Sequence, residues 1–123
     1  MILSGRELDV MNILWERGSA TVSEVLHDLD DDLAYTTVLT ILRRLEGKGH
    51  VGHDSDGKAH RYLPLVERSE AQDSALRRVT RKLFHDSPKL LMSRLIGTGA
   101  LSKAQLRELR AMVDQRLEDK GEQ

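Results

Sequence analysis

The sequence predicts a mostly α-helical protein: three helices and a β-hairpin form an N-terminal domain, and three further helices form a C-terminal domain. Three observations lead to this fold class. Ser/Thr-x-x-Glu/Gln spacings precede four segments of helical hydrophobic periodicity. An Asp-Gly pair lies between two short strand-like segments. Apolar side chains recur at three- and four-residue steps through the last 55 residues. We predict domains at 1–68 and 69–123.

The first three helices are predicted within 50 residues. The four spacings are typical of capping boxes; they are Ser4 with Glu7, Thr21 with Glu24, Ser69 with Gln72, and Ser102 with Gln105. The first helix is expected over 5–17, with Leu8, Met11, Leu14 and Trp15 on its apolar face and Gly18 as its C-terminal cap. The second is expected over 22–29 and the third over 36–48. Three short helices so close together are typical of a helix-turn-helix core.

A β-hairpin is predicted after Gly49. Its strands are expected over 50–54 and 59–65, separated by Ser55-Asp56-Gly57-Lys58, in which Asp-Gly favours a tight turn. Pro64 is expected to end the pairing, because proline has no backbone N–H to donate. Three helices followed by a hairpin are the element order of a winged helix.

The residues after 68 are predicted to form three thin amphipathic helices. Their apolar stripes are Leu76, Val79 and Leu83; then Leu90, Leu91 and Leu95; then Leu106, Leu109, Val113 and Leu117. Such helices make a small core by themselves, since even a 60-residue domain buries only about 60% of its unfolded surface. We therefore expect the first and third stripes to form a dimerisation surface. Packing of these stripes within one chain is the alternative.

Composition limits the classes of function. The chain has 123 residues and no cysteine, which excludes disulfides, thiolate metal sites and a cysteine nucleophile. The longest uncharged run, 33–42, is far shorter than the about 20 residues of a membrane span, and no signal peptide opens the chain. These features predict a cytoplasmic protein without membrane insertion. Catalytic and phosphate-loop motifs are absent, so we predict no enzyme, no cofactor and no metal.

The third helix carries the most informative surface. Val38, Ile41, Leu42 and Leu45 fall within an arc of about 100° that faces the core. The opposite arc contains hydroxyls and arginines and no carboxylate: Thr36, Thr37, Thr40, Arg43 and Arg44. Threonine and arginine can bind phosphates and base edges. We interpret this arc as the face of a recognition helix, with an ordinary solvated face as the alternative. Tyr35 and Lys48, near the ends of the helix, complete this part of the candidate DNA-binding set.

The hairpin supplies two further DNA-binding candidates, Lys58 and Arg61, which lie at or beside the turn where a wing would contact the DNA backbone. Turn solubility is the alternative explanation. The hairpin could instead assemble a metal site from His50, His53, His60, Asp54 and Asp56. No recognised ligand spacing supports that site.

Net charge bears on the DNA hypothesis. The whole chain has 19 basic and 20 acidic residues, whereas residues 1–66 have seven basic and eleven acidic ones, a charge of −4. DNA binding therefore requires the acidic residues to lie away from the contact face. Asp30, Asp31 and Asp32 allow this, because they cluster in one loop.

With these residues in place, the chain resembles the penicillinase-repressor family of winged-helix regulators, which control β-lactamase, methicillin-resistance and, in one branch, copper-transport genes. The match covers nearly the whole chain. The matching stretches are Leu3-Ser4 with Glu7, Val10-Met11 and Leu14-Trp15; Ala20-Thr21-Val22 with Glu24-Val25; Ala34 to Thr40 with Leu42, Arg44-Leu45 and Lys48-Gly49; Arg61-Tyr62 with Pro64-Leu65; and Leu101-Ser102 with Leu106, Glu108-Leu109 and Arg110.

The resemblance implies a homodimer whose C-terminal helices interlock and whose two winged helices bind a palindromic operator and block transcription. In antibiotic-responsive members, a membrane sensor-protease system leads to cleavage at an Asn-Phe bond in the C-terminal domain. The aligned pair here is Arg94-Leu95. The cysteine pairs of the copper branch are missing as well.

The sequence therefore predicts a dimeric transcriptional repressor that binds a double-stranded DNA operator with dyad symmetry and is relieved by an unidentified signal. Two alternatives come from other classes. One is a winged-helix protein-interaction module without DNA binding, which the −4 charge favours. The other is a small metal-responsive sensor that uses the hairpin histidines.

Overall fold

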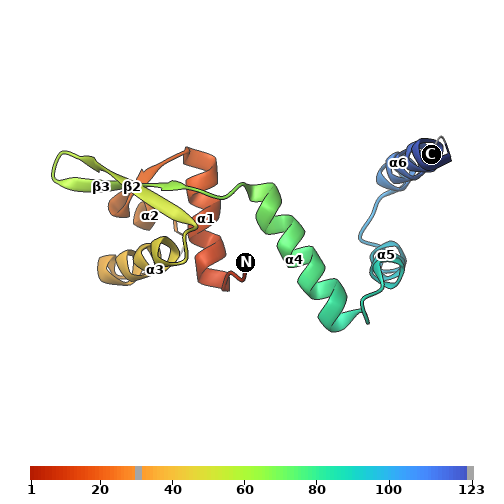
Figure 1. The fold of residues 1–123 in the computed structure, drawn as a ribbon, viewed down its shortest axis with the longest axis horizontal. Helices are drawn as coiled ribbons and strands as arrows, with labels where there is room; N and C mark the ends of the chain where they lie inside the picture. The colour runs from red at the N-terminus through yellow and green to blue at the C-terminus, as the bar shows by residue number, and fades with distance from the viewer. Residues whose placement is uncertain (30–31, 122–123) are drawn as a thin grey trace. The chain divides into compact units, whose positions relative to one another are not determined.

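The computed structural model describes residues 1–29 and 32–121, and within them it contains six helices and three short strands (Figure 1). The chain forms two compact units, Met1–Leu76 and Arg77–Gln123. This division falls inside one helix, and the predicted boundary at 68/69 falls after the first residue of the same helix. The predicted fold class, a mostly helical chain with an N-terminal winged helix and C-terminal helices, is confirmed.

The first two helices begin where capping boxes predict them, whereas the third, predicted over 36–48, begins one residue earlier and has no side-chain cap. The three helices are α1 (Gly5–Arg17), α2 (Val22–Asp28) and α3 (Tyr35–Gly47). At the start of α1, the backbone N–H of Glu7 donates to Ser4 Oγ at 3.2 Å, and the Glu7 carboxylate accepts from the N–H of Ser4 at 2.9 Å. Thr21 and Glu24 form the same box at α2. Gly18 ends α1 with a φ of 82°, a value that glycine adopts without steric cost.

The sheet contains one strand more than predicted. β2 (Val51–Asp56) and β3 (Ala59–Pro64) form the hairpin, and β1 (Ala20–Thr21) pairs with the other edge of β3, so the antiparallel order is β1-β3-β2. The expected four-residue turn is wrong, because Asp56 pairs with Ala59 and only Gly57 and Lys58 form the loop. Gly57 has a φ of 63°, as the first loop position of a type II′ turn requires.

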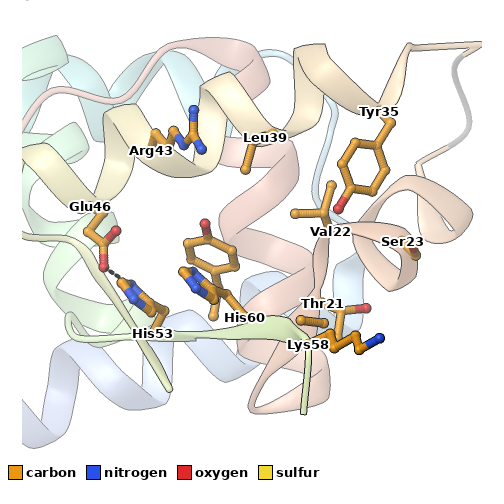
Figure 2. A pocket seen from close by; sticks show the side chains of 12 residues that line it. Thr21, Val22, Ser23, Tyr35, Leu39, Arg43, Glu46, His53, Lys58 and His60 are labelled. Atoms are coloured by element: carbon orange, nitrogen blue, oxygen red, sulfur yellow. Dashed lines mark hydrogen bonds and ion pairs between the residues drawn. The ribbon is translucent and has the colours of Figure 1, made fainter. Parts of the chain in front are cut away.

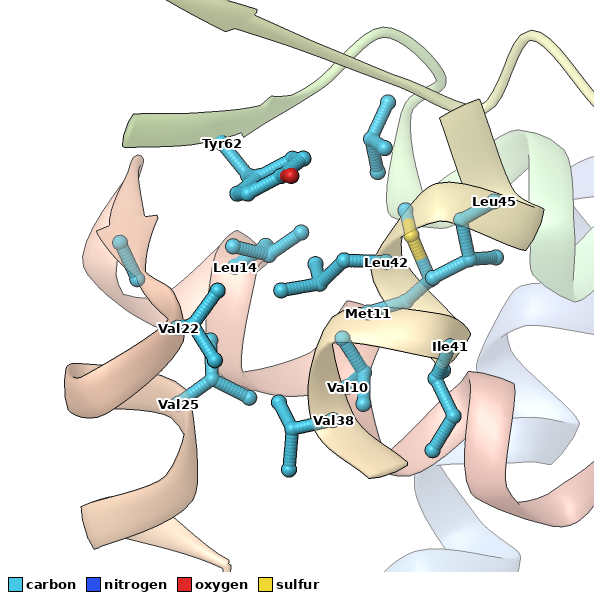
Figure 3. Close-up of a cluster of buried hydrophobic side chains, with 12 residues drawn as sticks. Val10, Met11, Leu14, Val22, Val25, Val38, Ile41, Leu42, Leu45 and Tyr62 are labelled. Carbon is cyan, nitrogen blue, oxygen red and sulfur yellow. The ribbon is translucent and has the colours of Figure 1, made fainter. Parts of the chain in front are cut away.

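The core of the N-terminal unit lies between the three helices and the sheet (Figure 3). Val38, Ile41, Leu42 and Leu45 of α3 are all buried in it, as the helical period predicts. On α1, Val10 is buried, whereas Leu8 is 38% exposed and does not share the apolar face predicted for it. Tyr62 of β3 closes the core on the sheet side.

The C-terminal helices are α4 (Arg68–Leu83), α5 (Pro88–Gly97) and α6 (Lys103–Gly121). Ser102 and Gln105 form the expected capping box at α6. The box predicted at Ser69 is wrong: α4 begins one residue earlier, so Ser69 is already helical. Among the described residues, α5 and α6 bury no side chain. Their apolar residues are therefore left at the surface of the unit.

Candidate nucleic-acid interface

The outer face of α3 has the composition that the sequence predicts. Its threonines and arginines (Thr36, Thr37, Thr40, Arg43 and Arg44) are exposed, and Tyr35 at the start of the helix is 50% exposed. Thr40 Oγ1 donates to the backbone carbonyl of Thr36 at 2.8 Å. This bond uses the hydroxyl proton and leaves the oxygen lone pairs as acceptors. The face therefore presents arginine donors and threonine methyl groups to a binding partner.

Lys48 lies just beyond α3 and binds the first helix. Its Nζ donates to both carboxylate oxygens of Glu7, at 2.8 and 2.9 Å, and Glu7 is almost fully buried. Burial by itself would raise the pKa of the Glu7 carboxyl, but hydrogen bonds from Lys48 and Ser4 outweigh it and hold that pKa below its ordinary value. Lys48 thus stabilises the fold in addition to any role at DNA.

Arg61 lies in β3 and also has a carboxylate partner. Its Nη2 is 2.9 Å from Glu24 Oε1, and its Nη1 donates to Ser19 Oγ at 3.3 Å. Glu24 further accepts from Arg17, which in turn holds Asp28. The backbone N–H of Thr21 lowers the pKa of Glu24, and Arg61 and Arg17 lower it further. Lys58, in contrast, is exposed in the two-residue turn.

A cleft of about 490 Å³ with polar and apolar walls separates α3 from the hairpin (Figure 2). Its walls come from the start of α2, one flank of α3 and both strands of the hairpin. Inside it, the rings of His53 and His60 stack with centroids 4.3 Å apart and an angle of 3° between their planes. Glu46 of α3 pairs with Nδ1 of His53. Sequence reasoning missed this cleft, although a hairpin register with a two-residue turn places both histidines on the same face.

The hairpin histidines are not arranged like metal ligands. Within residues 1–29 and 32–121, no group of three or more His, Asp or Glu side chains is placed to hold a metal ion. The lone pairs of an imidazole lie in the ring plane, so parallel stacked rings direct them along parallel planes and not toward one ion. Of the other candidate ligands, Asp54 is exposed on β2, and the side chain of Asp56 lies outside what the structure describes. Asp30 and Asp31, expected to lie in a loop away from the DNA-contact face, are also outside the described residues.

The predicted dimerisation residues lie at the surface. Leu76, Val79 and Leu83 of α4 are 55%, 43% and 71% exposed. The stripe on α6 borders an apolar groove of about 550 Å³ between α5 and α6. Its apolar lining residues are Met92, Ile96, Leu106, Leu109, Met112, Val113 and Leu117. Arg94 and Leu95, the pair aligned with the family's cleavage bond, are exposed on α5.

In the part of the chain that the structure describes, no helix combines the length and the apolar character needed to cross a bilayer.

Comparison with known proteins identifies the family. The penicillinase repressor family model matches residues 3–115. The methicillin resistance regulatory protein MecI of Staphylococcus aureus is 25% identical over 93% of this chain and 94% of its own. The transcriptional regulator BlaI of Mycobacterium tuberculosis is 41% identical over 55% of this chain and 51% of its own. These relatives are regulators, not enzymes.

A solved structure gives the same result for the N-terminal unit. The solution structure of monomeric Bacillus licheniformis BlaI in complex with the blaP half-operator superposes with a TM-score of 0.50 and 30% identity, over 57% of this chain and 88% of that one. Since the family model spans most of the sequence, the chain belongs to the penicillinase repressor family.

Proposed function

We propose that this protein is a DNA-binding transcriptional repressor that acts as a homodimer on an operator with dyad symmetry. The observation that carries the proposal is the exposed, carboxylate-free face of α3 in a winged helix. The relative that superposes on this unit is a repressor solved with a DNA half-operator, which supports the same function.

The recognition step follows from dimensions and chemistry. An α-helix with its side chains is about 10–12 Å wide, which matches the about 12 Å width of the DNA major groove. With α3 in that groove, Arg43 and Arg44 reach base edges or phosphates, and Thr36, Thr37 and Thr40 contact phosphates or thymine methyl groups. Tyr35 and Lys48 contact DNA near the two ends of α3. Lys58 in the turn contacts the backbone beside the groove, and Arg61 supports the wing from β3.

The dimer brings two such helices to two half-sites. The apolar groove between α5 and α6 supplies one surface for a second copy. The exposed Leu76, Val79 and Leu83 of α4 supply another. A two-fold dimer matches an operator with dyad symmetry, with half-sites about 34–36 Å apart or a multiple of this distance. Within this proposal, residues 1–68 bind DNA and residues 69–123 dimerise.

Repression is relieved by a signal in this proposal. Arg94 and Leu95 lie on α5, which lines the apolar groove, so a cut there would divide the dimerisation surface. Because Arg-Leu stands where the antibiotic-responsive members have Asn-Phe, we leave a membrane sensor-protease system out of the proposal.

The test measures binding of the full chain to palindromic DNA from its own promoter by fluorescence anisotropy. The double variant Arg43→Ala/Arg44→Ala is expected to weaken binding, because each lost base contact costs about 1–3 kcal/mol. Affinity should also fall steeply as salt is added, since phosphate contacts release counterions.

The control is Arg77→Ala/Arg81→Ala, which removes the same charge from an exposed face of α4. It should bind like the wild type. Unchanged affinity of the α3 variant, or a flat salt response, would instead support the protein-interaction module that the −4 charge of residues 1–66 favours.

A further inference from the structure

The cleft between α3 and the hairpin contains an exposed histidine. His60 is exposed on β3, and within the described residues its ring contacts are the stack on His53 and a tilted contact with Tyr62 at 6.4 Å. Figure 2 shows both histidine rings across the cleft from α3, below Leu39 and beside the side chain of Glu46.

The cleft lies directly beside the proposed recognition face. At 100° per residue, the α3 residues that line it, Tyr35, Leu39, Arg43 and Glu46, occupy the arc between the core face and the exposed threonines. Arg43 belongs to both surfaces. When a helix fills a major groove, the two phosphate backbones run along its flanks. The backbone on this flank therefore passes over the mouth of the cleft.

The charged and titratable groups that face the cleft favour an anion. Arg43, Glu46 and Tyr35 come from α3, His53 from β2, Lys58 from the turn, and His60 and Tyr62 from β3. The start of α2 adds the hydroxyls of Thr21 and Ser23. Glu46 is the single carboxylate among the lining residues, and it is paired with Nδ1 of His53. The remaining ionisable groups are cationic, neutral or able to gain a proton.

We propose that the cleft binds a backbone phosphate of the operator and that His60 takes up a proton when it does so, which makes operator binding tighter at lower pH. This inference rests on the proposed function. His53 Nδ1 already pairs with Glu46, so the one carboxylate of the cleft has a partner. A positive charge on the adjacent stacked ring of His60 has no carboxylate partner in the cleft, and a phosphate diester supplies the missing negative charge. An imidazolium then donates a charge-assisted hydrogen bond to a phosphate oxygen.

The sign of the pH effect follows from linkage. A complex that binds more protons than its free components becomes more stable as pH falls. Histidine is the side chain that titrates between about pH 5 and 8. We expect operator affinity about fivefold higher at pH 6 than at pH 8 at constant ionic strength.

The experiment measures the ratio of affinities at pH 6 and pH 8 by anisotropy, with the full chain and its operator. In His60→Gln the ratio should fall toward one, because glutamine fills a similar space and does not titrate in this range. The matched control is His27→Gln, an exposed histidine of α2 that does not line the cleft. It should keep the wild-type ratio.

The outcomes separate this inference from the proposed function. If no variant and no pH gives salt-dependent operator binding, the proposed function fails. If specific binding is present but its pH ratio is one, or is the same in His60→Gln as in the wild type, only the phosphate assignment fails. The His60 ring is also followed by NMR in sodium phosphate without DNA. Saturation at millimolar phosphate would assign the cleft to a free anion and overturn its assignment to the DNA backbone.

Discussion

The two compact units differ in how far their apolar side chains are buried. In the N-terminal unit, Leu14 of α1 and Leu42 of α3 are fully buried, and the helices and the sheet close over one core. In the C-terminal unit, Met112 and Leu117 of α6 are each 63% exposed. The first unit completes its own fold. The second presents a surface that its own helices do not cover, which is the behaviour expected of an element that folds against a partner.

The two units also differ in the range of their polar side-chain contacts. In the N-terminal unit, the indole N–H of Trp15 donates to the carbonyl of Val66 at 2.9 Å, and the guanidinium of Arg68 lies 5.4 Å from the indole ring centre. These contacts connect the end of the hairpin segment to α1. Side-chain hydrogen bonds of the described residues in α5 and α6, in contrast, join residues three or four positions apart. They stabilise single helices and not a packed core.

The largest expected effect comes from placing charge on the α6 stripe. Leu109→Asp/Val113→Asp would bury unpaired carboxylates at the proposed dimer surface. We expect a monomer, and a loss of operator affinity of about 100-fold or more, because two linked half-site contacts become one. Sedimentation velocity measures the oligomeric state and anisotropy measures the affinity. The fluorescence of Trp15, the single tryptophan of the chain, should remain native.

A control with the same charge change uses the opposite face of α6. Ala104→Asp/Ala111→Asp lies on exposed positions away from the groove and should leave the dimer intact. A wild-type protein that sediments as a monomer at micromolar concentration contradicts the proposed role of the stripe. So does full affinity in a monomeric variant.

A smaller effect is expected from the ion pair that ties the end of α3 to α1. Lys48→Met keeps the aliphatic stem but leaves the buried Glu7 carboxylate without its ammonium partner. We expect the N-terminal unit to lose about 1–3 kcal/mol of unfolding free energy at pH 7, measured by urea denaturation with Trp15 fluorescence.

The pH dependence of this loss has a definite sign. The folded protein holds the pKa of Glu7 below its ordinary value, so this group contributes stability above the unfolded pKa and loses it as pH falls through the folded one. The difference between wild type and Lys48→Met should therefore shrink from pH 7 to pH 4. Lys58→Met, which changes an exposed turn lysine, should unfold like the wild type. Equal stability of the two lysine variants would show that the pair contributes nothing.

The sequence predicts the elements better than it predicts their contacts. The capping residues predicted both ends of α1 correctly, because Ser4 and Gly18 act through hydrogen bonds to backbone groups a few residues away. The two-residue strand β1 was missed, since it exists only by pairing with β3, 40 residues later. Leu8 was wrongly placed on the buried face of α1. The helical period gives the direction of that face but not how much of it the neighbouring elements cover. Both errors concern contacts between residues that are far apart in the sequence, which local patterns do not contain.

In the candidate site, too, the sequence predicted local features and missed contacts between distant residues. The exposed arc of α3 follows from one helical period, and the sequence predicted it residue by residue. The partners of Lys48 and Arg61 are Glu7 and Glu24, which lie 41 and 37 positions away along the chain, and no local pattern indicates them. The histidine cleft needed the hairpin register together with the flank of α3. Its residues were noticed in the sequence, but as possible metal ligands.

The smallest expected effect compares one glycine from each unit. Gly57 in the hairpin turn and Gly99 between α5 and α6 have φ values of 63° and 77°, and a Cβ added at either would meet no atom within 4 Å. Alanine at either position therefore costs only backbone strain, about 1–2 kcal/mol. Gly57→Ala should lower the urea midpoint reported by Trp15. Gly99→Ala should leave that midpoint unchanged and weaken self-association in sedimentation equilibrium. Asparagine at each position should restore part of the loss, because it tolerates positive φ. A shift of the Trp15 midpoint as large for Gly99→Ala as for Gly57→Ala would mean that the two units unfold as one.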